Sequence, residues 1–207
     1  MQKKSKENER MLRIYQREQD ILSLGPGKRY CLWVQGCNRH CHGCISPLSQ
    51  DLNGGYLMSP RAVAMEIALS AAEGVTISGG EPFLQSTELA EMLTDIKNVT
   101  GREMGVIIYT GYLLEELQKM EEAQTLLAMT DLLIDGPYIQ ELDDGKALRG
   151  SSNQGIHFLT PRYDRPEIRD MYGADRRVVQ TIRHGFGITR VGVYNYDNTN
   201  IEEVYLL

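Results

Sequence analysis

The feature that most constrains the fold of this chain is a regular alternation of predicted strands and helices between residues 30 and 135. Short β-branched, aliphatic and aromatic runs predict strands, and segments with apolar residues every three or four positions predict helices. The predicted strands cover residues 30–35, 75–78, 105–110 and 132–135, and the predicted helices cover residues 60–73, 86–99 and 114–129. This order predicts an α/β fold with a mostly parallel sheet and crossover helices.

The segments that flank this alternation carry weaker patterns. Residues 1–10 form a charged run without a period, which predicts a frayed end, and residues 11–23 show a weak strand pattern. Residues 136–175 are rich in charge, glycine and proline, so we expect them to be mostly loop. Two strand-like runs, residues 176–183 and 188–194, flank His184-Gly185-Phe186-Gly187 and predict a β-hairpin.

Composition excludes several classes of protein. The chain has 207 residues, of which 42% are hydrophobic and 24% charged, and its formal net charge is −6. This length predicts one domain, and the balance excludes a disordered chain. No apolar run approaches the roughly 18 residues of a membrane span, and no signal peptide is recognisable. The negative charge argues against binding nucleic acid through bulk electrostatics. We therefore expect a cytoplasmic protein that contacts neither a membrane nor nucleic acid.

Unusual residues follow each of the four predicted strands. The cysteines follow the first strand, and Gly79-Gly80-Glu81-Pro82 follows the second. Thr110-Gly111-Tyr112 ends the third strand, and Asp135-Gly136-Pro137 ends the fourth. Ligands of parallel α/β sheets bind at the carboxyl ends of the strands. The four loops therefore predict one active site at that edge of the sheet.

All four cysteines fall within fourteen residues, which indicates metal or redox chemistry rather than a disulfide framework. Cys37, Cys41 and Cys44 form a C-x3-C-x2-C motif. Three thiolates on one short loop can hold a [4Fe–4S] cluster and leave one iron without a protein ligand. The alternative is a structural zinc site that adds His40 or His42, although no second ligand pair follows downstream. Cys31 lies inside a predicted strand, where a buried, apolar environment is expected.

The glycine motif is less specific when it is taken alone. Gly79 and Gly80 allow the backbone to approach a ligand closely, and exposed N–H and C=O groups there can bind an amino acid's charged ends. A pair of glycines also occurs in ordinary tight turns. The motif lacks the pattern of a dinucleotide site or a P-loop. Its position one βα unit after the cysteine loop, residues 37–44, is what favours a ligand site.

Together the two motifs resemble those of the radical S-adenosylmethionine (SAM) superfamily. The closer resemblance, over about residues 24–160, is to the small activating enzymes of glycyl radical enzymes, above all the anaerobic ribonucleotide reductase activase group. Its stretches are Gly25-Pro26-Gly27-Lys28-Arg29, Gln35-Gly36-Cys37, Ser78-Gly79-Gly80-Glu81-Pro82, Tyr109-Thr110-Gly111-Tyr112, Asp135-Gly136 and Arg149-Gly150-Ser151-Ser152-Asn153-Gln154. The resemblance implies a partial (open) TIM-like β/α barrel. It divides the chain into an N-terminal extension (1–23), a radical SAM core (24–160) and a C-terminal extension with the hairpin (161–207).

The resemblance also implies the residues of the site. Cys37, Cys41 and Cys44 would each ligate one iron of a [4Fe–4S] cluster, and SAM would chelate the fourth. Adenine would contact the backbone at residues 43–45, and the glycine motif would meet the methionine group. The residues assigned to SAM are Gly43, Cys44, Ile45, Ser78, Gly79, Gly80, Glu81, Tyr109, Thr110 and Asp135.

The implied function is that of a radical SAM activase. Reductive cleavage of SAM would give a 5′-deoxyadenosyl radical, which takes hydrogen from a backbone glycine of a large glycyl radical enzyme. The expected partner is an anaerobic ribonucleotide reductase, and the expected reductant is a protein such as flavodoxin. One alternative is a radical SAM enzyme for another glycyl radical enzyme, a peptide or a small metabolite. An alternative of another class is a zinc or iron–sulfur binding module without turnover.

Overall fold

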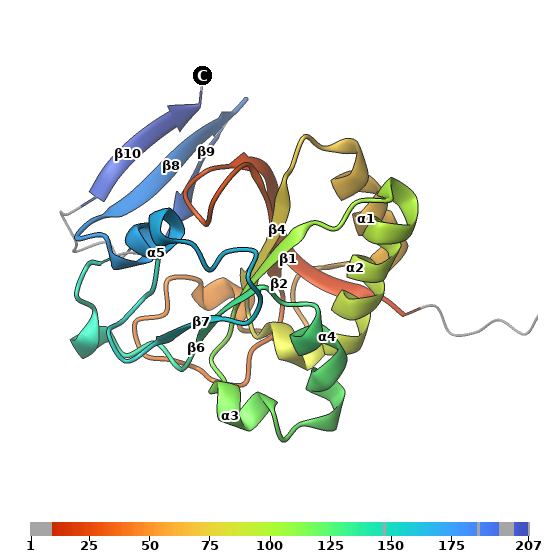
Figure 1. The fold of residues 1–207 in the computed structure, drawn as a ribbon, viewed down its shortest axis with the longest axis horizontal. Coiled ribbons are helices and arrows are strands. Elements are labelled where there is room, and N and C mark those ends of the chain that lie inside the picture. Colours follow the sequence, from red (N-terminus) through yellow and green to blue (C-terminus); the bar gives the residue numbers. More distant parts are fainter. Residues whose placement is uncertain (1–9, 147, 186, 195–200, 207) are drawn as a thin grey trace, which may run out of the picture.

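The computed structural model describes residues 10–146, 148–185, 187–194 and 201–206. Its centre is a seven-stranded sheet with the strand order β3-β1-β2-β4-β5-β6-β7 (Figure 1). The parallel strands are β2 (Arg29–Val34), β4 (Gly74–Gly79), β5 (Gly105–Tyr109) and β6 (Leu132–Asp135). Antiparallel strands extend both sides, namely β1 (Leu12–Ile21), β3 (Tyr56–Met58) and β7 (Gly155–Phe158). The predicted α/β fold with a mostly parallel sheet is confirmed.

Helices cover one face of this sheet. They are α1 (Pro60–Leu69), α2 (Ser86–Thr100), α3 (Leu114–Leu117) and α4 (Gln124–Ala128). The helix start at Ser59-Pro60 is confirmed, because the Ser59 side chain accepts a hydrogen bond from the Ala62 N–H. The periodic apolar residues of α2 pack with alternate residues of the strands, such as Leu32, Ile77 and Ile108, in one large core. The period of the apolar residues therefore predicted which face of each element is buried.

One prediction about local structure was wrong. The expected helix over residues 114–129 is broken at Met120, whose backbone is extended. The Gln124 side chain makes this break possible, because its amide donates to the carbonyls of Leu117 and Met120 at 2.9 and 2.8 Å. Residues 136–175 are mostly loop, as predicted, and also contain β7 and the helix α5 (Pro166–Gly173). The weak strand pattern at residues 11–23 corresponds to β1, which pairs with β2.

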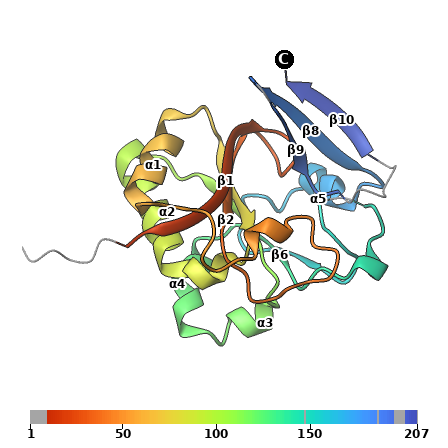
Figure 2. The same cartoon turned by 180° about the vertical axis from the view of Figure 1, so that it is seen from behind.

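The C-terminal segment forms a second, three-stranded sheet. The predicted hairpin is confirmed as β8 (Arg177–His184) and β9 (Gly187–Gly192), and β10 (Ile201–Leu206) pairs parallel to β8. Phe186 of the predicted turn and the expected frayed end at residues 1–9 lie outside the described residues. Figures 1 and 2 place this sheet on the side of the main sheet opposite α1, α2 and α4. None of the helices in the described ranges is long and apolar enough to span a bilayer.

Candidate active site

The cysteine loop is closed at its base by backbone hydrogen bonds. It begins where β2 ends, and the N–H groups of Gly36 and Cys37 donate to the carbonyls of Ser49 and Gln50 at 2.7 and 3.1 Å. The side-chain amide of Gln35 donates to two further carbonyls of the returning chain at 3.0 and 2.7 Å. Gly36 has a φ of +99°, which favours glycine. The two ends of the loop are therefore fixed to each other.

The front of the loop is attached to the segment that follows β5. Asn38 donates from its side-chain amide to the Tyr112 hydroxyl at 2.8 Å. The Arg39 guanidinium lies 3.8 Å from the centre of the Tyr112 ring and 2.9 Å from a carboxylate oxygen of Glu116. Contacts of this kind combine a cation–π interaction with an ion pair. They hold the first cysteine of the loop beside the carboxyl end of β5.

The glycines after β4 are required by close packing of backbone against backbone. A Cβ atom on Gly79 would lie 2.5 Å from the Val34 backbone, and one on Gly80 would lie 2.1 Å from the Gly36 carbonyl oxygen. The Gly80 N–H donates to the Val34 carbonyl, and the Glu81 N–H donates to the Gly36 carbonyl, both at 2.8 Å. The glycine motif therefore fits directly against the start of the cysteine loop.

Glu81 connects the glycine motif to β5. Its buried carboxylate accepts hydrogen bonds from the Phe83 N–H at 3.0 Å, the Thr110 hydroxyl at 2.8 Å and the Gly111 N–H at 2.8 Å. Burial raises the pKa of this carboxyl, and the three donors oppose that shift. Because protein groups bond to both of its oxygens, the side chain holds the two loops together.

Asp135 has a similar structural environment at the end of β6. Its carboxylate accepts from the Leu114 N–H at 2.6 Å and from the Gly155 N–H at 3.1 Å. The His157 Nε2 atom lies 3.0 Å from the same carboxylate. Asp135 thereby connects β6, the start of α3 and β7 below the surface of the site.

These loops surround one open cleft. The predicted site residues that line it are Cys37, Cys41, Gly43, Cys44, Ile45, Ser78, Gly79, Tyr109 and Thr110. Gly80, Glu81 and Asp135 are not among the lining residues. The structure thus brings most of the predicted site together and places these three behind it.

Sequence reasoning assigned few residues of the rest of the cleft lining. Residues that it did not assign to the site come from the β6–β7 connection and from the C-terminal sheet. They are Tyr138, Asp143, Gly150, Gln154, Arg177, Gly192, Val193 and Tyr194. Gly136, which also lines the cleft, belongs to the Asp135-Gly136-Pro137 loop predicted for the site, and the Arg149–Gln154 run carried part of the family resemblance. No sequence signal marked Arg177 as a site residue, because it lies in a run that shows only the pattern of a strand.

The three thiols of the cysteine motif share one cleft. Within the described part of the chain, no three His, Cys, Asp or Glu side chains gather closely enough to hold one metal ion. A [4Fe–4S] cluster binds each thiolate to a different iron. The Cys37 thiol accepts a hydrogen bond from the Arg39 N–H at 3.4 Å, and burial raises its pKa. Three thiols along one cleft, with glycine backbone opposite them, fit a cluster with a bound small molecule.

Cys31 is separate from this group. It packs with Ile21, Leu24 and Val191 and is 1% exposed. Burial raises the pKa of its thiol to about 12, so the thiol stays neutral at physiological pH. The expectation that Cys31 is a buried apolar side chain is confirmed.

Comparison with known proteins also indicates an iron–sulfur cluster. A family model described as a 4Fe-4S single cluster domain matches residues 23–157. The anaerobic ribonucleoside-triphosphate reductase-activating protein of Vibrio cholerae is 34% identical over 144 residues, which are 66% of this chain and 91% of that protein. The proteins of the same name from Escherichia coli K12 and Enterobacteria phage T4 are 31% and 32% identical, over 94% and 85% of their lengths. This chain therefore belongs to the 4Fe-4S single cluster family and to the activase group of the radical SAM superfamily.

Proposed function

We propose that this chain activates an anaerobic ribonucleoside-triphosphate reductase by removing a hydrogen atom from a backbone glycine of that enzyme. The observation that carries the proposal is the single cleft lined by Cys37, Cys41 and Cys44 together with residues of the β4 and β5 ends. The relatives named as reductase-activating proteins supply the identity of the partner. When bound, the [4Fe–4S] cluster and SAM supply the electron transfer and the radical chemistry that no side chain can provide.

Within this proposal the three cysteines hold the cluster, and their number leaves one coordination position for SAM. Gly43, Ile45, Ser78, Gly79, Tyr109 and Thr110 provide the walls against which SAM binds. Glu81 and Asp135 act as positioning residues, because their carboxylates hold the loops that carry these walls. Gly80 acts through its close fit to the Gly36 backbone.

The proposed organisation is a radical SAM core over residues 24–160 whose sheet is a partial, open barrel. Four parallel strands with their helices on one face support this arrangement. Residues 1–23 and 161–207 are the extensions, and β1 attaches the first of them to the sheet. An open barrel leaves room for a loop of a large partner enzyme at the carboxyl edge.

The reductant we propose is a flavodoxin-like protein, and the proposed compartment is the cytoplasm. The formal charge of −6 supports the exclusion of nucleic acid as a partner. Four cysteines without a disulfide support a reducing compartment.

The decisive experiment uses protein that is purified without oxygen, reconstituted with iron and sulfide, and reduced. We expect a [4Fe–4S]⁺ EPR signal that changes shape when SAM is added, with 5′-deoxyadenosine formed in the same sample. Addition of the anaerobic reductase from the same genome should then give a glycyl radical signal on the reductase. Zinc in place of iron, or a cluster that does not respond to SAM, would overturn the proposal. SAM cleavage without a radical on the reductase would leave the chemistry intact and point to another substrate.

A further inference from the structure

The C-terminal sheet lies outside the region that the family model matches, residues 23–157, yet it forms part of the cleft. Arg177 of β8 and Gly192, Val193 and Tyr194 at the end of β9 all line it. The cysteines line the same cleft. A segment beyond the shared core therefore contributes to the cleft that the cysteine loop lines.

The C-terminal sheet is attached to the turn between β1 and β2 by specific contacts. Val191 packs with Ile21, Leu24 and Cys31. The Ser23 hydroxyl donates to the Val191 carbonyl at 2.7 Å. The Gln180 side chain accepts from the Leu22 N–H at 2.8 Å and donates to the Asp20 carbonyl at 3.0 Å. This sheet therefore has a fixed position from which Arg177 can act.

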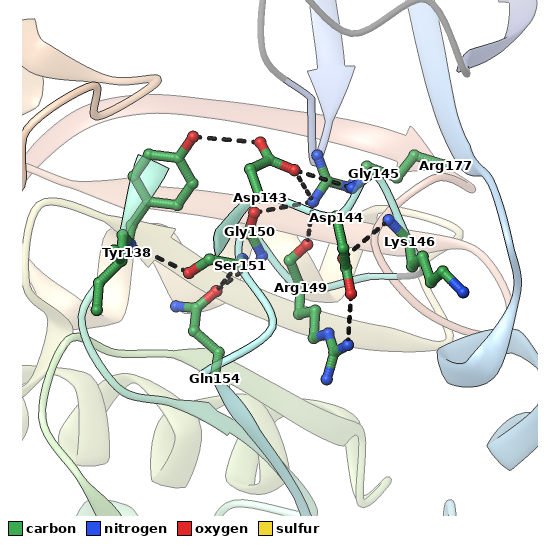
Figure 3. Close-up of polar contacts among 11 residues, drawn as sticks. Tyr138, Asp143, Asp144, Gly145, Lys146, Arg149, Gly150, Ser151, Gln154 and Arg177 are labelled. Atoms are coloured by element: carbon green, nitrogen blue, oxygen red, sulfur yellow. Dashed lines mark hydrogen bonds and ion pairs between the residues drawn. The ribbon is translucent and has the colours of Figure 1, made fainter. Parts of the chain in front are cut away.

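Arg177 reaches from β8 into the connection between β6 and β7, as Figure 3 shows. Its Nη2 atom donates to the carbonyls of Arg149 and Gly150 at 2.7 and 2.9 Å. The same nitrogen lies 2.8 Å from a carboxylate oxygen of Asp143. Both side chains of this ion pair are almost completely buried, at 0% and 3% exposure. One arginine thus bonds to three residues of a loop that lies 27–34 positions earlier in the chain.

The loop that Arg177 holds, residues 138–146 and 148–154, is called the wall loop here. It is also bonded within itself (Figure 3): the Tyr138 hydroxyl lies 3.2 Å from Asp143, and Arg149 pairs with Asp144 at 2.7 Å. The Gln154 side chain accepts from the Gly150 N–H at 2.7 Å. Tyr138, Gly150 and Gln154 line the cleft, so any shift of this loop changes the cleft's width.

The Arg177 guanidinium does not contribute to stability as well as a fully paired or apolar side chain would. Its Nε and Nη1 atoms are buried and have no hydrogen-bond partner among the described residues. A buried cation with unpaired donors is destabilising compared with an apolar side chain of similar volume. Departures of this kind from good packing are expected at functional sites.

We propose that Arg177 is a positioning residue through which the C-terminal sheet keeps the wall loop closed over the cysteine loop. The inference deepens the proposed function, on which it rests, by assigning a purpose to the C-terminal extension. A closed wall excludes water and small reductants from the cleft. It also keeps SAM cleavage coupled to hydrogen abstraction from the correct substrate. Loosening the wall loop should therefore waste SAM rather than prevent its binding.

The first test is hydrogen–deuterium exchange on the full-length protein without cofactors. Loss of a charge-assisted buried contact in Arg177→Met should raise the exchange rate of amides at residues 150–152 about tenfold. Arg177→Lys, which retains the charge, should restore most of the protection. The matched control is Arg183→Met, which removes an exposed arginine from the same strand. Wild-type protection of these amides in Arg177→Met would overturn the proposal.

The second test is the ratio of 5′-deoxyadenosine released to glycyl radical formed on the anaerobic reductase. A ratio does not depend on the fraction of active protein, so partial unfolding of a variant does not change it. We expect it to rise on the order of tenfold in Arg177→Met, to rise less in Asp143→Asn, and to stay at the wild-type value in Arg183→Met. An unchanged ratio with a loosened loop would overturn the coupling effect. If wild-type protein forms no radical on the reductase, the proposed function fails, and the exchange rates alone decide whether Arg177 holds the wall loop.

Discussion

The amino and carboxyl ends of the parallel strands form two edges of the main sheet, and a buried arginine lies at each: Arg29 of β2 at the amino edge, and Arg177 of the C-terminal sheet beside the loops of the carboxyl edge. At the amino edge, all three nitrogens of Arg29 have acceptors, which are Thr76, Tyr163, Pro26 and the carbonyls of Val75 and Gly105. At the carboxyl edge, Arg177 bonds through one nitrogen only. The Arg29 guanidinium is therefore fully satisfied within the protein, whereas the Arg177 guanidinium keeps two unpaired nitrogens beside an open cleft. In parallel α/β folds the first edge serves stability and the second serves ligands.

The glycines at the two edges also differ in what they leave room for. A Cβ atom on Gly74 would lie 2.0 Å from Arg29, and one on Gly105 would lie 1.9 Å from the Tyr163 hydroxyl. These glycines leave room for a packed polar cluster. At the carboxyl edge, Gly79 and Gly80 leave room for the cysteine loop itself. Changes at the two edges should therefore separate stability from activity.

The largest effect is expected for a cysteine of the carboxyl edge. Cys41→Ser removes one of three thiolates, so iron incorporation should fall to background and SAM cleavage at least about 1000-fold. The urea unfolding midpoint of the cofactor-free protein should stay unchanged, since Cys41 is only half-buried. Iron analysis and a 5′-deoxyadenosine assay provide the measurement.

Cys31→Ala is the matched control for this cysteine. It should retain the cluster and cost about 1–2 kcal/mol of unfolding free energy, because it removes a buried atom from an apolar cluster. Loss of iron in Cys31→Ala, with retention in Cys41→Ser, would contradict the assignment of the two thiols.

At the amino edge the expected effect is on stability. Arg29→Met leaves the Tyr163 hydroxyl and two backbone carbonyls without their donor, which should cost about 3 kcal/mol or more in unfolding free energy. The measurement is urea unfolding followed by circular dichroism. Arg183→Met, an exposed substitution, should stay within about 0.5 kcal/mol of the wild type. Equal losses in the two variants would remove the distinction between the edges.

The smallest effect concerns pH and Glu81. Burial raises the pKa of this carboxyl in the folded state above its ordinary value of 4.5. The folded protein therefore binds the proton more tightly than the unfolded chain, and the stability that this provides is present below pH 4.5. It is lost as the pH rises through the raised pKa. The unfolding free energy of the wild type minus that of Glu81→Gln should accordingly decrease with rising pH. A difference that increases over that range would show that the three hydrogen bonds to the carboxylate outweigh its burial.

Local pattern was sufficient to predict most of the strand and helix order over residues 30–135, because most of these elements have a clear period and end next to a glycine, although the helix predicted over residues 114–129 is broken. It also predicted that the cysteines and Ser78-Gly79 share a cleft. It could not predict β3 and β7, which are only three and four residues long. Their pairing depends on partners far away in the sequence.

The roles of the polar residues were harder to predict than their proximity to the site. Glu81 and Asp135 stand in the expected loops, yet their oxygens bond to backbone N–H groups that come from other loops. Arg177 depends on acceptors 27–34 residues away. Side-chain hydrogen bonds between distant segments leave no periodic trace in the sequence, so only the folded chain reveals them.

The closed base of the cysteine loop has a consequence for cluster assembly. Residues 36 and 37 are bonded to residues 49 and 50 by backbone groups alone. Because these bonds use no side chain of the cysteine motif, they leave all three thiols available to ligands. They also lower the conformational entropy that the loop has left to lose when a cluster binds, since its two ends are already held together.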